Sequence, residues 1–169
     1  EIKECDWSSD VCSSDLNAEA RGRELFKDGF YCAEAVCKAT AEGQGMDHAL
    51  IPGMATGFCG GMARSGGPCG AVTGAVLALG LVHGRVDPEQ SARPTYDAVR
   101  AMMRAFEHRF GSTNCTELLG VDLDTTEGRK DFEEQNLASK CIDFTGAAAA
   151  MVEQILKDAA ARSADTNGP

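Results

Sequence analysis

Eight cysteines are the residues of this 169-residue chain whose type and spacing could do chemistry. No two of them are separated by only two residues, so the sequence has no thioredoxin-type motif, no typical zinc ribbon and no c-type haem attachment site. It also lacks a Walker A motif and a Gly-x-Gly-x-x-Gly loop that could hold a nucleotide phosphate. Any chemistry must therefore come from cysteines that the fold brings together.

The opening segment, residues 1–16, is set apart from the fold. It contains a doubled Ser-Ser-Asp and shows neither helical nor strand periodicity, and the stretch 10–16 resembles a translated short-read sequencing adapter. The alternative is a natural polar tail. On both readings Cys5 and Cys12 carry no functional weight, and the native N-terminus, with any signal peptide, is expected to be hidden. Without this segment the formal net charge of −10 becomes −6, because five acids and one lysine are removed.

Four of the other six cysteines share a local setting, because each lies at or near the start of a predicted helix. They are Cys32, Cys69, Cys115 and Cys141. Free backbone N–H groups and the helix dipole stabilise a thiolate at such a position, so a lowered pKa and a raised reactivity are expected. A thiolate of this kind can attack a disulfide, form a sulfenic acid or ligate a metal.

The remaining two cysteines differ from these four. Cys37 follows Cys32 by five residues, which places the two about 140° apart around a helix. We therefore interpret Cys37 as a small core residue, a common role for free cysteine. Cys59, beside Gly60 and Gly61, fits core packing and a place in the site about equally well.

The elements that must position these cysteines are predicted to be helices. From Asn17 onward the sequence is rich in Ala, Leu, Glu, Arg and Met and has few β-branched runs. We expect an all-α fold: one compact bundle of about six helices over residues 17–161, followed by a disordered polar tail over 162–169. Predicted helical segments are 18–28, 32–42, 52–58, 69–82, 95–110 and 140–161, with a further helix start capped by Asn114.

Two of the predicted helices carry specific expectations. The central one, 69–82, is rich in glycine, so Gly74 and Gly80 predict a close approach of helices or room for a site. Gly70 and Gly74 would let the chain pass near the site without side-chain obstruction. The clearest helix, 95–110, is expected to bury one apolar face made of Val99, Met102, Met103, Phe106 and Phe110.

The cysteine settings resemble those of a known family. The stretches that carry the resemblance are Gly29-Phe-Tyr-Cys-Ala-Glu-Ala-Val36, Gly57-Phe-Cys-Gly-Gly-Met62, Cys69-Gly-Ala-Val-Thr-Gly74, Phe110-Gly-Ser-Thr-Asn-Cys-Thr-Glu-Leu-Leu-Gly120 and Cys141. Together they resemble the redox-active proteins named for their C_GCAxxG_C_C pattern. The resemblance extends from Asn17 to about Leu156 and implies a helical, redox-active protein whose four family cysteines fall on Cys32, Cys69, Cys115 and Cys141. Related sequence occurs in some multihaem cytochromes, whose haem-attachment motif this chain lacks.

Two functions of different classes follow from four such cysteines. The preferred one is thiol–disulfide electron transfer, in which the helix starts converge and Cys69 lies close to at least one of the other three. The alternative is a metal or iron–sulfur site with the four thiolates as ligands, although metal sites commonly use a closer cysteine pair. Four buried thiols with only a packing role are a third reading. A plain disulfide framework is less expected in an apolar chain of this size.

Composition limits the partners and the location. The acidic charge argues against nucleic acid, and the longest apolar stretch, 71–82, is too short to span a bilayer. The expected partner is a redox protein or a small oxidant, and no motif identifies a cofactor. A cytoplasmic location is expected for cysteines that are reactive rather than structural. If the cysteines carry out thiol–disulfide electron transfer, the protein is a thiol-based oxidoreductase.

Overall fold

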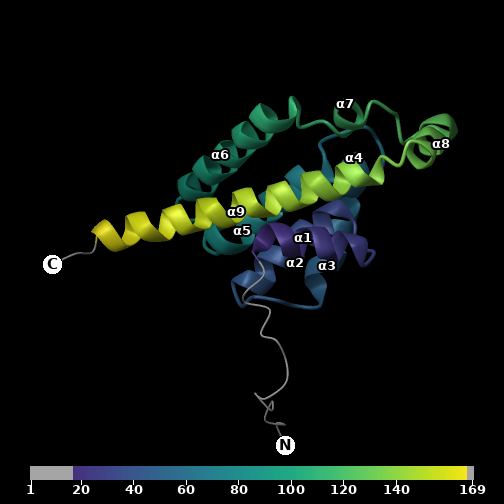
Figure 1. Cartoon of the computed structure of the whole chain (residues 1–169). Helices are drawn as coiled ribbons and strands as arrows, with labels where there is room; N and C mark the ends of the chain where they lie inside the picture. The colour runs from purple at the N-terminus through teal and green to yellow at the C-terminus, as the bar shows by residue number, and fades with distance from the viewer. Residues whose placement is uncertain (1–16, 167–169) are drawn as a thin grey trace, which may run out of the picture.

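The computed structural model describes residues 17–166, with side chains as far as Arg162 (Figure 1). The segment 1–16, with Cys5 and Cys12, lies outside the described residues. The regular elements of the described part are α1 (Ala18–Lys27), α2 (Cys32–Gly43), α3 (Leu50–Ala55), the 3-10 turn η2 (Thr56–Phe58), α4 (Cys59–Met62), α5 (Gly70–His83), α6 (Arg93–Phe110), α7 (Cys115–Leu119), α8 (Thr126–Glu134) and α9 (Ala138–Thr166). The predicted all-α class is confirmed.

The expected number of about six helices is wrong, because several short helices were not counted. The clearest omission is α8, which is highly polar and therefore has no apolar period to reveal it. Its start is fixed locally, since the Thr125 hydroxyl accepts a hydrogen bond from the Gly128 N–H at 2.9 Å. At the other end, α9 continues to Thr166, so the first part of the predicted polar tail is helical.

The long C-terminal helix α9 crosses the molecule and packs against α1, α2, α5 and α6 (Figure 1). The glycine-rich helix α5 lies between α2, α6 and α9, which confirms its central place. At Gly74 a Cβ would lie 2.6 Å from the Ala33 carbonyl oxygen and 2.7 Å from the Ala33 Cα. The predicted close approach of helices is therefore confirmed at Gly74, where α5 meets α2. A Cβ at Gly80 would have no such neighbour within 4 Å, so the predicted close approach of helices is wrong at Gly80.

Helix α6 buries a narrower face than its sequence predicted. Met102 and Phe106 are fully buried, whereas Met103 is 38% exposed. Met103 stands about 100° around the helix from Met102, beyond the edge of the contact with α5 and α9. The buried end of this face is aromatic: the ring of Phe110 lies 4.7 Å from that of Phe106 and 4.9 Å from that of Phe144 on α9.

Backbone hydrogen bonds hold the starts of α5 and α7 side by side. Pro68 and Asn114 form an isolated antiparallel bridge. The N–H of Cys69 donates to Thr113 O at 2.8 Å, and that of Cys115 donates to Gly67 O at 2.9 Å. As predicted, Asn114 caps α7, its side chain accepting from the Glu117 N–H at 3.1 Å. Two cysteines 46 positions apart in sequence therefore begin neighbouring helices.

Among residues 17–166, no helix combines the length and apolar character that a membrane crossing requires.

Candidate functional site

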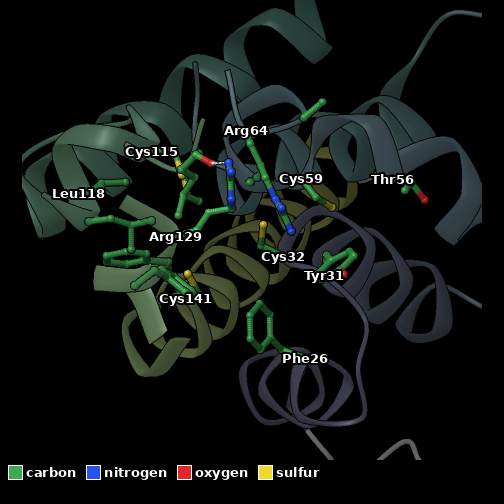
Figure 2. A pocket seen from close by; sticks show the side chains of 18 of the residues that line it. Phe26, Tyr31, Cys32, Thr56, Cys59, Arg64, Cys115, Leu118, Arg129 and Cys141 are labelled. Carbon is green, nitrogen blue, oxygen red and sulfur yellow. Dashed lines mark hydrogen bonds between the residues drawn. The ribbon is translucent and has the colours of Figure 1, made fainter. Parts of the chain in front are cut away.

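A pocket of about 400 Å³ lies where the starts of several helices meet, and five cysteines line it. They are the four predicted site residues Cys32, Cys69, Cys115 and Cys141, together with Cys59. Figure 2 shows the labelled cysteines arranged around one space. Cys37 is not among the lining residues and is only 1% exposed, within the core, as interpreted from its place on the helix.

Cys32 and Cys59 form a pair of neighbouring thiols in the pocket. Their thiols are near enough to interact and both residues lie beside Gly70, although they are 27 positions apart in sequence. The Cys59 sulfur also lies 3.6 Å from the Ala55 carbonyl oxygen and receives the backbone N–H groups of Ala33 and Glu34. The interaction with the Cys32 thiol and the burial of the Cys59 thiol raise the pKa of Cys59 well above its ordinary value. Cys59 therefore holds its proton at neutral pH.

Glu34 fixes the elements that carry this pair. Its carboxylate is almost fully buried and accepts hydrogen bonds from the Tyr31 N–H at 2.8 Å and the Thr56 hydroxyl at 2.6 Å. The first contact caps the start of α2, directly beside Cys32. The second ties that start to η2, which leads into Cys59. The buried Glu34 side chain thus holds in place both segments of the chain that carry the two sulfurs.

The other three cysteines form a second group that adjoins the pair. Cys69 and Cys115 contribute to the raised pKa of Cys141, and Cys115 and Cys59 contribute to that of Cys69. Cys69 is therefore near enough to interact with Cys59, Cys115 and Cys141. The structure brings together all four cysteines that the sequence singled out. All six cysteines of the described part, Cys37 included, are free thiols.

The predicted lowering of the thiol pKa values is wrong for the residues that show a shift. Burial raises the pKa of Cys69 and Cys115 to about 11 and that of Cys141 to about 12. The helix-start effect is present at Cys69, where the N–H groups of Ala71 and Val72 favour the thiolate, but it is smaller than the cost of desolvation. At neutral pH these thiols are therefore protonated.

A left-handed turn lies between Cys59 and Arg64 and places both residues at the pocket. Five successive residues, 60–64, have positive φ angles between 54° and 75°. Glycine adopts this region freely, but Met62, Ala63 and Arg64 each pay about 1–2 kcal/mol for it. Such strain persists only where the surrounding structure imposes it, and it concentrates at functional sites. In the sequence, Gly60 and Gly61 indicate only the first half of this left-handed turn.

Replacing Ala63 by glycine is expected to stabilise the protein by up to about 1 kcal/mol, because it relieves the left-handed strain at φ 54°. The matched control is Ala101→Gly, the same change at an exposed right-handed position of α6, which should destabilise by about 1 kcal/mol. Urea unfolding of both variants measures the difference. Destabilisation of equal size by both would show that residue 63 is not held in a left-handed conformation.

Gly70, beside Cys69, allows α5 to begin close to Cys32. A Cβ at this position would overlap the Cys32 sulfur and lie 3.1 Å from the Cys59 Cα. The expectation that Gly70 lets the chain pass next to the site is thus confirmed, whereas Gly74 serves the contact between α5 and α2.

Metal-ligand geometry is not preformed in the described part of the chain. Within residues 17–166, no three side chains of His, Cys, Asp or Glu are disposed to hold one metal ion. The five pocket cysteines line one space as free thiols.

Comparison with known proteins agrees with the cysteine pattern. A family model described as "Putative redox-active protein (C_GCAxxG_C_C)" matches residues 30–155. The chain belongs to this family. The matched region contains all five pocket cysteines of this C_GCAxxG_C_C protein. A relative from Archaeoglobus fulgidus, which bears the name "Uncharacterized protein", is 28% identical over 151 residues, covering 83% of this chain and 94% of the relative. No solved structure matches the chain.

The lining residues that were not predicted as part of the site include Cys59, Arg64 and Arg129. Cys59 had a sequence signal, since it precedes two glycines, but that signal fitted packing equally well. Arg64 and Arg129 had none, because single arginines in polar segments are ordinary surface residues. Only the fold of the C_GCAxxG_C_C domain brings their side chains into the same pocket as the cysteines.

Proposed function

We propose that this protein is a thiol–disulfide electron-transfer protein in which Cys32 and Cys59 form the redox pair. The observation that carries the proposal is the approach of these two cysteines beside Gly70, where an added Cβ would overlap the Cys32 sulfur and lie 3.1 Å from the Cys59 Cα, inside a pocket that three more thiols line. Cysteines that approach one another in this way need only a small movement to reach the geometry of a disulfide. The redox-active character of the family supports the same chemistry.

The reaction partner is a disulfide, either a small molecule or a partner protein. The Cys32 thiolate attacks one sulfur of the partner, forming a mixed disulfide and releasing the first partner thiolate. The Cys59 thiolate then attacks the Cys32 sulfur, forming the Cys32–Cys59 disulfide and releasing the second. The protein loses two electrons and two protons, and the partner disulfide becomes two thiols.

Cys32 is the attacking sulfur because the proton stays on Cys59. The interaction with the Cys32 thiol and burial raise the pKa of Cys59, so little Cys59 thiolate is present to attack the partner first. Cys59 acts second, as the resolving thiol. The N–H groups of Ala33 and Glu34 that point at its sulfur stabilise the thiolate at the moment it forms.

The other thiols extend the redox capacity of the pocket. After Cys32 and Cys59 are oxidised, the Cys69 thiolate can attack Cys59 and release Cys32 as a thiolate. Cys115 or Cys141 can then attack Cys69 and release Cys59, which moves the disulfide to the second group without net oxidation. All four cysteines predicted from sequence thereby take part in electron transfer.

Disulfide mapping tests the proposal. The reduced protein is treated with one equivalent of the azo oxidant diamide, blocked with iodoacetamide and digested with trypsin. Cys59, Cys69, Cys115 and Cys141 then fall on different peptides, whereas Cys32 and Cys37 share residues 28–38. Mapping is therefore repeated in Cys37→Ala, which leaves Cys32 as the one cysteine of that peptide. The expected first product links residues 28–38 to the Cys59 peptide in both proteins.

Two outcomes would contradict the proposal. In the first, Cys32 and Cys59 are both alkylated after oxidation while other cysteines are linked. In the second, anaerobically purified protein contains stoichiometric iron or zinc and its pocket thiols resist oxidation, which would favour the four-cysteine metal site instead.

A further inference from the structure

Two arginines reach into the pocket without an acidic partner (Figure 2). Arg64, at the end of the left-handed turn, is exposed and makes no hydrogen bond or ion pair with any residue of the described part. Arg129 on α8 donates to the carbonyl oxygens of Leu123 at 2.9 Å and Asp124 at 2.7 Å. These backbone contacts orient its guanidinium but leave its charge uncompensated.

The pocket is therefore locally positive in an acidic protein. Its third charged lining residue is Glu133, which leaves one net positive charge, while the whole chain carries a formal net charge of −10. The thiols do not cancel this charge, because burial keeps Cys69, Cys115 and Cys141 protonated at neutral pH. Unpaired guanidiniums beside apolar walls favour an anion with planar oxygens, such as a carboxylate.

Apolar side chains such as Leu118, Phe132 and Phe144 line the same space as the two guanidiniums and the sulfurs. Such a pocket fits a molecule whose carboxylates are joined to its reacting atoms by a few methylene groups.

We infer that the pocket takes a small disulfide that carries carboxylates, which Arg64 and Arg129 bind while its S–S bond lies beside Cys32. The inference rests on the proposed function and names the substrate class of the same site. Two protein thiols and one such disulfide give the Cys32–Cys59 disulfide and two carboxylate-bearing thiols, so atoms and electrons balance. A neutral disulfide would undergo the same reaction without the help of the arginines.

A charge series of disulfides tests this selection. Fully reduced protein is oxidised with dithiodipropionate, hydroxyethyl disulfide and cystamine, which are doubly negative, neutral and doubly positive. Each second-order rate constant is divided by that of mercaptoethanol with the same disulfide, which removes differences in intrinsic reactivity. We expect the anionic disulfide to be preferred by about tenfold or more over the neutral one, despite the negative charge of the protein.

Arginine variants locate the source of the preference. Arg64→Gln is expected to slow oxidation by dithiodipropionate about tenfold and leave the rate with hydroxyethyl disulfide unchanged. Arg64→Lys should keep part of the preference. The matched control is Arg104→Gln, which removes the same charge from an exposed position of α6 outside the pocket and should change neither rate. Arg129→Gln is measured only if circular dichroism shows that this variant has native helix content. If it does not, the Arg64 variants alone test the inference.

A binding measurement separates recognition from redox chemistry. Suberate has the same length and charge as dithiodipropionate but no sulfur. It should raise the Tm of the wild type and of Arg104→Gln, and not that of Arg64→Gln. Equal normalised rates across the charge series, or equal slowing by Arg64→Gln and Arg104→Gln, would overturn the inference while leaving the proposed function intact. If hydroxyethyl disulfide itself forms no Cys32–Cys59 link in the wild type, the proposed function falls instead.

Discussion

Cys59→Ser is expected to trap a mixed disulfide on Cys32. When the reduced variant meets hydroxyethyl disulfide, Cys32 attacks and binds half of the reagent, but the resolving thiol is absent. In the wild type we expect the same adduct to be short-lived, because Cys59 and the Cys32 sulfur both lie beside Gly70 and an intramolecular thiol acts at a very high effective concentration. We expect the lifetime of the adduct to increase about 100-fold or more. Intact mass spectrometry of acid-quenched samples measures the adduct over time.

Two further variants make this result specific. Cys32→Ser should form no long-lived adduct at Cys59, since the attacking sulfur is gone. Cys37→Ala removes a thiol that does not line the pocket, so it should clear its adduct as fast as the wild type. Equally rapid clearance in Cys59→Ser would assign resolution to another thiol, such as Cys69, and the Cys32–Cys59 pairing would be wrong.

The protein is expected to lose several kcal/mol of stability between pH 9 and 11 under reducing conditions. Burial raises the pKa of Cys37 in the folded protein from 9.0 to about 11, and the thiols of Cys69, Cys115 and Cys141 are shifted in the same direction. In the unfolded chain these thiols ionise near their ordinary pKa. Above pH 9 the unfolded state therefore binds fewer protons than the folded state, and the free energy of unfolding falls by up to about 1.4 kcal/mol per pH unit for each thiol.

Cys37→Ala isolates one of these contributions. Cys37 is 1% exposed and has burial as the cause of its shift, so its removal should flatten the pH slope by about 1 kcal/mol per pH unit over this range. Val36→Ala is the control: it removes a neighbouring buried group, which lowers stability at every pH but leaves the slope unchanged. Urea unfolding in the presence of a phosphine reductant measures both. An unchanged slope in Cys37→Ala would show that its thiol is not shielded from water.

The strained turn links the two halves of the site. Cys59 directly precedes this turn and Arg64 ends it, so the same five residues position the proposed resolving thiol and the arginine assigned to the substrate. The fold holds this strain because Glu34 ties η2 to α2 on one side and the Pro68–Asn114 bridge fixes the chain on the other. A relaxed right-handed turn would carry these side chains in other directions.

Much of the helical framework could be predicted from the sequence. Periodicity predicted α6, glycine content predicted the central place of α5, and Asn114 predicted the cap of α7. These signals are local, since a period, a cap and a stop each depend on residues within a few turns. The helix α8 was missed because Phe132 is its one large apolar residue, which is too few to show a periodic apolar face. Met103 was misplaced because a sequence shows the centre of a buried face better than its edge.

For the site, the sequence by itself determined which thiols could act together. Their helix-start settings and the family pattern selected Cys32, Cys69, Cys115 and Cys141, and the structure brings all four to one pocket. Only the tertiary structure decided their partners and their protonation. Cys59 joins Cys32 through the packing of η2 against α2, and burial outweighs the helix-start effect on the thiols that show a shift. The reason is physical: helix starts are set by neighbours in sequence, whereas desolvation and contact depend on the distant segments that close over each sulfur.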